Sequence, residues 1–217
     1  MKQTTIKRPI GFSGPMVRAI LDGRKTQTRR IIKHRENRWE CSDDGVTGKA
    51  WPFWPCYVFG EPEPIAMPCP YGKPGDRLWV RETFNSDWCD QVIFKADGGS
   101  AKDAGYTKEP KWKRSIHMPR WASRITLEIT AVRVERLGDI SEADAIAEGI
   151  ESRPISWLPT ASEYRYYGWI YKHDQWSLSP MNSYESLWES INGPESWAAN
   201  PWVWVIQFQK VDQTPCQ

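Results

Sequence analysis

The apolar residues of this chain change their spacing repeatedly, from helical to strand periodicity and back. Val17, Ile20 and Leu21 have helical spacing between Pro15 and Gly23, two residues suited to begin and end a helix. The stretch "KTQTRRII" that follows is rich in β-branched residues and predicts a strand. Because strands and short helices alternate in this way, we expect an α+β protein built on a small curled sheet or barrel.

Further stretches predict short elements of both kinds. Residues 77–84 follow a Pro-Gly turn and predict a strand, and residues 123–137 predict a longer strand pair or a bulged strand. The segment "DISEADAIAEGI" predicts a helix with Ser141 as its N-cap and Gly149 as its stop. "SYESLWESING" predicts a second amphipathic helix, and "NPWVWVIQFQKV" a last strand that is apolar on both faces at its start.

Three long segments do not join this pattern. Residues 36–70, 85–117 and 152–180 carry prolines, glycines and aromatic residues without sustained periodicity, so we predict long loop insertions. A chain of 217 residues fits one domain with insertions. We therefore expect a single domain over residues 1–217, with the insertions packed on it as loops.

Charge is spread unevenly over a chain whose formal net charge is only +2. Residues 17–38 hold eight Lys or Arg against two acids, and residues 111–124 hold five against none. Residues 135–151 are acidic. Two explanations stay open: a polyanionic or phosphate-bearing partner at the basic segments, or salt bridges between the basic and acidic segments.

Fourteen tryptophans are unusual for a chain of this length. Most of them are expected in the core, because Trp buries a large area per residue. A few could instead stack on a nucleobase. Trp121 is the first choice, because it follows Arg120 in a basic segment, and Trp54 and Trp112 are weaker choices.

Several classes of protein are disfavoured. The chain has no run of about 18 apolar residues and no charged-then-apolar leader, so we expect a cytoplasmic protein without a membrane partner. Its five cysteines form no C-x-x-C pair, which favours reduced thiols. His34, Cys41, Cys56 and Cys69 lack the paired spacing of zinc sites, so we expect no metal and no cofactor. The sequence does not indicate an oligomeric state.

Four segments, in this order, carry a family resemblance: "ILDGRKTQTRR", "KPGDRLWVRE", "DISEADAIAEGI" and "NPWVWVIQF". They are similar to the ASCH family, small proteins with a β-barrel related to the PUA RNA-binding fold. The whole chain resembles the longer, tryptophan-rich ASCH proteins of bacteriophages and prophages. The resemblance covers residues 11–212, with the three long segments as embellishments. It implies a PUA-like barrel.

The resemblance also implies a site. Some small bacterial ASCH proteins are amidohydrolases that remove the acetyl group of N(4)-acetylcytidine with a lysine, a threonine and a glutamate. The matching residues here are Lys25, Thr28 and Glu148, and Arg30 matches the family arginine. Those hydrolases are about half as long as this chain, so the insertions could reshape the site. The candidate substrate-binding residues are Arg29, Arg30, Glu82, Arg120, Trp121 and Ser123.

The chemistry of these residue types fits an amide hydrolase. A threonine hydroxyl must give its proton to a neighbouring base as it attacks a carbonyl. Lys25 can be that base only if its pKa is lowered, and the charges of Arg24, Arg29 and Arg30 would lower it. An ionised Glu148 beside Lys25 would oppose this shift. We therefore expect Glu148 a step away, where it passes a proton to the departing amine.

A second function, from a different class, is compatible with the same residues. Other ASCH proteins are regarded as RNA binders or are reported as ribonucleases. The basic segments could hold a base and its phosphates without catalysis. The partner is then RNA rather than a modified nucleoside.

Overall fold

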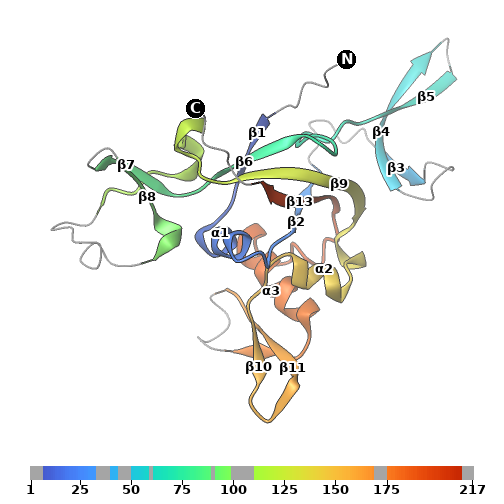
Figure 1. Ribbon diagram of the computed structural model, residues 1–217. Helices are drawn as coiled ribbons and strands as arrows, with labels where there is room; N and C mark the ends of the chain where they lie inside the picture. The colour runs from blue at the N-terminus through green and yellow to red at the C-terminus, as the bar shows by residue number, and fades with distance from the viewer. Residues whose placement is uncertain are drawn as a thin grey trace. The chain divides into compact units, whose positions relative to one another are not determined.

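The protein combines many short strands with few helices. A computed structural model describes residues 7–32, 40–43, 50–58, 61–88, 91–98, 110–168 and 175–211 (Figure 1). The predicted α+β class is confirmed. No helix within these ranges is long and apolar enough to cross a membrane.

Five strands form the largest sheet, in the order β1-β6-β9-β13-β2. β1 and β6 run parallel, whereas β6 pairs antiparallel with β9, and β13 pairs antiparallel with β2. The strands are β1 (Lys7–Gly11), β6 (Arg77–Arg81), β9 (Thr126–Arg136), β13 (Trp202–Val211) and β2 (Gln27–Ile31). β2, β6, β9 and β13 follow predicted strand segments, whereas β1 was not predicted; β9 is one continuous strand. No closed barrel forms among the described strands.

The segments predicted as loops contain strands, so that prediction is wrong. Prolines account for the missed prediction in some of these strands, since proline is a poor strand former; Pro55 of β4 nevertheless pairs with Pro64 of β5. The smaller sheets are β3 (Glu40–Asp43), β4 (Ala50–Val58) and β5 (Glu61–Ala66); β10 (Ser152–Ile155), β11 (Leu158–Arg165) and β12 (Trp176–Ser177); and β7 (Phe84–Trp88) with β8 (Gln91–Phe94).

The helices begin and end where their capping residues predict. Ser141 Oγ accepts the backbone N–H of Asp144 at 3.2 Å at the start of α2, and Gly149 follows its end with a φ of 83°. Gly23, with a φ of 75°, follows α1 in the same way. The helices are α1 (Gly14–Leu21), α2 (Glu142–Ala147) and α3 (Pro180–Asn192), with short 3-10 helices η1 (Lys95–Asp97), η2 (Ser115–His117), η3 (Arg120–Ala122) and η4 (Leu137–Asp139).

The chain divides into two compact units. Unit 1 comprises Met1–Gly23, Tyr71–Thr130 and Phe208–Gln217, and unit 2 comprises Arg24–Pro70 and Ala131–Gln207. A cluster around Phe84, Met118 and Ala122 is buried in unit 1. In unit 2, the apolar stripe of α3, with Tyr184 and Trp188, packs with β13 and with Ala145 of α2. The predicted single domain over 1–217 stays a prediction.

Candidate functional site

The start of β2 is fixed to the end of α2 in unit 2. Lys25 and Glu148 form an isolated antiparallel bridge, and the backbone N–H of Thr26 donates to Ala147 O at 2.9 Å. The Gln27 amide donates to Asp144 O, a carbonyl in the last turn of the helix, at 2.8 Å. These bonds place Lys25 and Gln27 against the end of α2.

Two buried cations share the carboxylate of Glu148. Lys25 Nζ donates to Glu148 Oε2 at 2.7 Å and to the Glu148 backbone oxygen at 2.8 Å. Arg29 Nη1 donates to the other oxygen, Oε1, at 3.1 Å. The side chains of Lys25 and Arg29 have no exposed area, and that of Glu148 is 3% exposed. Water therefore does little to screen these charges.

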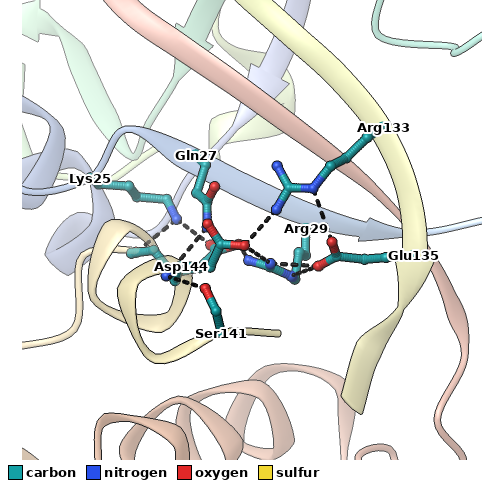
Figure 2. A network of polar contacts seen from close by, with 8 residues as sticks. Lys25, Gln27, Arg29, Arg133, Glu135, Ser141 and Asp144 are labelled. Atoms are coloured by element: carbon teal, nitrogen blue, oxygen red, sulfur yellow. Dashed lines mark hydrogen bonds and ion pairs between the residues drawn. The ribbon is translucent and has the colours of Figure 1, made fainter. Parts of the chain in front are cut away.

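Three further charged residues, Glu135, Asp144 and Arg133, extend the network from Arg29 toward the surface. Arg29 also donates to Glu135 and Asp144, and Arg133 bridges the same two carboxylates (Figure 2). Exposure rises outward from 16% at Glu135 to 28% at Arg133. The network as a whole joins three cations, Lys25, Arg29 and Arg133, to three carboxylates, Glu135, Asp144 and Glu148.

The uneven charge pattern had two explanations, a phosphate-bearing partner or salt bridges between the basic and acidic segments. The network supports the second explanation for part of the basic segment 17–38. Arg29, from the basic segment 17–38, is neutralised by carboxylates of the acidic segment 135–151. Salt bridges between the two segments are thus confirmed for this arginine. The acidic partners Glu135 and Asp144 were not among the predicted site residues, although the acidic run of 135–151 was the signal that pointed to them.

Burial disfavours a positive charge on Lys25. Desolvation lowers the pKa of Lys25 below its ordinary value, even though Glu148 opposes this shift. Arg30 and Arg29 lower it further, as predicted, but burial is the larger cause. The expectation that Glu148 lies a step away is wrong, because the carboxylate contacts Lys25 directly. Lys25 can nevertheless reach the neutral form at less cost than an exposed lysine.

Arg29 and the neighbouring Tyr184 hold their protons firmly. Burial alone would lower the pKa of Arg29, but the charges of Glu148, Tyr184 and Glu135 raise it overall. The guanidinium of Arg29 lies 5.9 Å from the ring centroid of Tyr184, and burial raises the pKa of that phenol well above its ordinary value. Of Lys25, Arg29 and Tyr184, Lys25 is therefore the residue whose proton is easiest to remove.

Thr28 is buried on β2, with 3% of its surface exposed. Side chains alternate along a strand, so Thr28 and Arg30 belong to one face of β2, and Gln27 and Arg29 to the other. Lys25 precedes the strand and is not bound by this alternation. The structure brings Lys25, Arg29 and Glu148 together, and the convergence of Thr28 on them stays a prediction.

Glu82 and Ser123 serve other contacts, within unit 1. Arg124 donates to both carboxylate oxygens of Glu82 at 3.0 Å, and also binds Asp97. The Ser123 hydroxyl donates to the backbone oxygen of Val80 at 2.8 Å. These bonds satisfy buried polar groups beside the sheet, and they account for both side chains structurally.

Arg120 and Trp121 also lie in unit 1, on η3. Trp121 is 71% exposed, so it is not one of the core tryptophans. Arg120 donates to the Thr126 hydroxyl at 3.2 Å. Their participation in one pocket with Lys25 stays a prediction.

The described residues contain no group of three or more His, Cys, Asp or Glu that could hold a metal ion. Cys69 is buried. His34 and the side chains of Cys41 and Cys56 lie outside the described residues, and so do those of Trp54 and the two other cysteines.

Neither protein-family models nor curated proteins match the sequence, and no solved structure matches the fold. The ASCH resemblance therefore rests on the four motifs and their order.

Proposed function

We propose that the protein hydrolyses the amide of a modified nucleoside or nucleotide, such as N(4)-acetylcytidine. One observation carries the proposal: a lysine with a lowered pKa is buried against a carboxylate, in the motif that resembles the ASCH hydrolases. Perturbed lysines of this kind act as general bases near neutral pH. The fold would then be a PUA-like ASCH domain in a cytoplasmic protein, without a metal or cofactor.

The proposed reaction has two steps. The Thr28 hydroxyl attacks the amide carbonyl as neutral Lys25 takes its proton, and the tetrahedral intermediate loses the nucleoside amine. Lys25 and Glu148, in direct contact, pass that proton to the amine as it departs. Water then attacks the acetyl ester on Thr28 with the same pair as base, releasing acetate and restoring the hydroxyl. Arg30 or a backbone N–H stabilises the oxyanion in both steps.

Arg29 has a separate part in this proposal. It holds one oxygen of Glu148, leaving the other toward Lys25. Glu135 and Asp144 hold Arg29 in turn, so its guanidinium is fixed from three sides. Arg29 would thus position Glu148 rather than bind the substrate.

RNA binding through the same residues is less well supported. A phosphate-binding surface needs cations whose charge is available to the ligand. Lys25 and Arg29 are buried, and carboxylates balance the charge of their network. Hydrolysis of a small neutral nucleoside requires no such excess of positive charge.

The direct test is incubation of the protein with N(4)-acetylcytidine, followed by chromatography. We expect equal amounts of cytidine and acetate from the wild type and neither product from Lys25→Met. The rate should change little with added salt, because a neutral nucleoside contacts few phosphates. Equal cytidine release by Lys25→Met and the wild type would refute the role of Lys25.

A further inference from the structure

Two arginines of unit 1 lie over a single tryptophan. The guanidinium of Arg81 is 4.6 Å from the ring centroid of Trp79, and that of Arg120 is 5.9 Å from it. Both distances fit cation–π contacts. Such a contact holds a guanidinium against the face of the ring without using its N–H groups as hydrogen-bond donors. Trp79 and Arg81 share one face of β6, two residues apart. β6 and η3 thus place two cations, Arg81 and Arg120, over the same ring.

Neither guanidinium has a carboxylate partner within the described ranges. The buried Arg81 Nε has no hydrogen-bond partner there, and Arg120 donates to the neutral hydroxyl of Thr126. Other arginines contrast with this: Arg124 binds Glu82, and Arg153, stacked at 4.1 Å on Trp176, binds Glu163. Two adjacent arginines without an acid favour an anionic ligand.

The surroundings add space and an aromatic platform. Gly11 of β1 pairs with Arg81, and within the described part of the chain no residue beyond its two neighbours comes within 4 Å of a Cβ atom built at Gly11. Trp121, next to Arg120 along the chain, exposes 71% of its surface. A planar guanidinium matches two oxygens of a phosphate, and an exposed indole stacks on a nucleobase.

We propose that Arg81 and Arg120, held on Trp79, bind the phosphate of a nucleotide whose base stacks on Trp121. The phosphate belongs either to a free mononucleotide or to a single-stranded nucleic acid, which share this chemistry. The site goes beyond the proposed hydrolase activity, because it uses none of Lys25, Thr28 and Glu148. It also identifies which of the two basic segments, 111–124 rather than 17–38, serves a phosphate-bearing ligand.

Two probes distinguish the sources of the phosphate. Fluorescence anisotropy measures binding of a labelled single-stranded oligouridylate over a salt series, and calorimetry measures binding of uridine monophosphate. Tighter binding of the oligonucleotide assigns the site to a strand. Equal affinities assign it to a free nucleotide, and both results support the phosphate site provided that the arginine variants weaken binding.

Four variants test the residues. Arg81→Gln and Arg120→Gln should each weaken binding and lower the slope of log affinity against log salt by about 0.7 for the oligonucleotide. Trp121→Ala should weaken binding about 5- to 150-fold, the equivalent of one stacked base. Arg153→Gln, the matched arginine on a tryptophan with its own carboxylate, should bind like the wild type. Wild-type affinity in both Arg81→Gln and Arg120→Gln, or no binding of either probe by the wild type, would overturn the proposal.

Discussion

The shared carboxylate of Glu148 predicts unequal effects on stability when its partners are removed. Lys25→Met leaves Glu148 paired with Arg29 at 3.1 Å, so the loss is one charged hydrogen-bonding partner, about 1.5–3 kcal/mol. Glu148→Gln leaves two buried cations around a neutral amide. Breaking a buried pair in this way costs about 3–5 kcal/mol. We therefore expect the glutamate substitution to lower the free energy of unfolding more than the lysine substitution.

The double variant, Lys25→Met with Glu148→Gln, measures the interaction between these two residues apart from their contacts with other groups. Part of the cost of Glu148→Gln is the unpaired charge of Lys25, which is absent when residue 25 is Met. The double variant should therefore lose less stability than the sum of the two single variants, by about 0.5–3 kcal/mol. Urea denaturation, monitored by circular dichroism, gives the free energy of unfolding of the wild type, the two single variants and the double variant. The denaturation midpoints are compared at a common slope.

Two outcomes would refute this reasoning. Costs that add within about 0.5 kcal/mol would show that Lys25 and Glu148 are not energetically coupled. A larger loss for Lys25→Met than for Glu148→Gln would show that Arg29 does not support the carboxylate. Arg153→Gln is the matched control: its ion pair with Glu163 is partly exposed, and its loss should cost at most about 1 kcal/mol.

Three other predictions concern stability. Because burial lowers the pKa of Lys25 below 10.5 in the folded state, the unfolded state binds one more proton between the two pKa values. The free energy of unfolding should therefore rise with pH in that window, by at most about 1.4 kcal/mol per pH unit, and the difference between wild type and Lys25→Met measures this rise. Ser141→Ala removes the cap of α2 and should cost about 0.5–2 kcal/mol by urea denaturation, whereas Ser141→Asp should largely keep it. Leu137→Ala opens a cavity at a fully buried side chain and should cost about 2–5 kcal/mol in the same assay; an unchanged midpoint would contradict its place in the core.

Local signals in the sequence predicted the elements that carry strong periodicity and caps. Ser141 and Gly149 bound α2 as expected, and the two-faced apolar run of 200–211 became β13, between β9 and β2. The strands within 36–70 and 152–180 were not predicted, because prolines and polar residues interrupt the two-residue alternation of apolar residues that indicates a strand. Pairing with a neighbouring strand, not local propensity, forms them.

The charge network could be predicted only in part. Lys25 and Glu148 were identified through the motif, but Glu135 is separated from Arg29 by 106 residues and sits on a different strand. Only the sheet and the end of α2 bring these charges together. The direct contact of Glu148 with Lys25 was also not expected: neighbouring arginines are visible in the sequence, whereas burial, the larger cause of the lowered pKa of Lys25, is set by the fold.

The most direct test of the proposed catalytic site compares three proteins side by side on N(4)-acetylcytidine, with cytidine release followed by chromatography. The account predicts turnover by the wild type and none by Thr28→Val, which removes the hydroxyl and keeps the branched shape. Glu148→Gln should be slower by about 10²–10⁴-fold, the usual loss for a general acid or base. Thr28→Val at the wild-type rate, or a wild type that releases no cytidine, would contradict it.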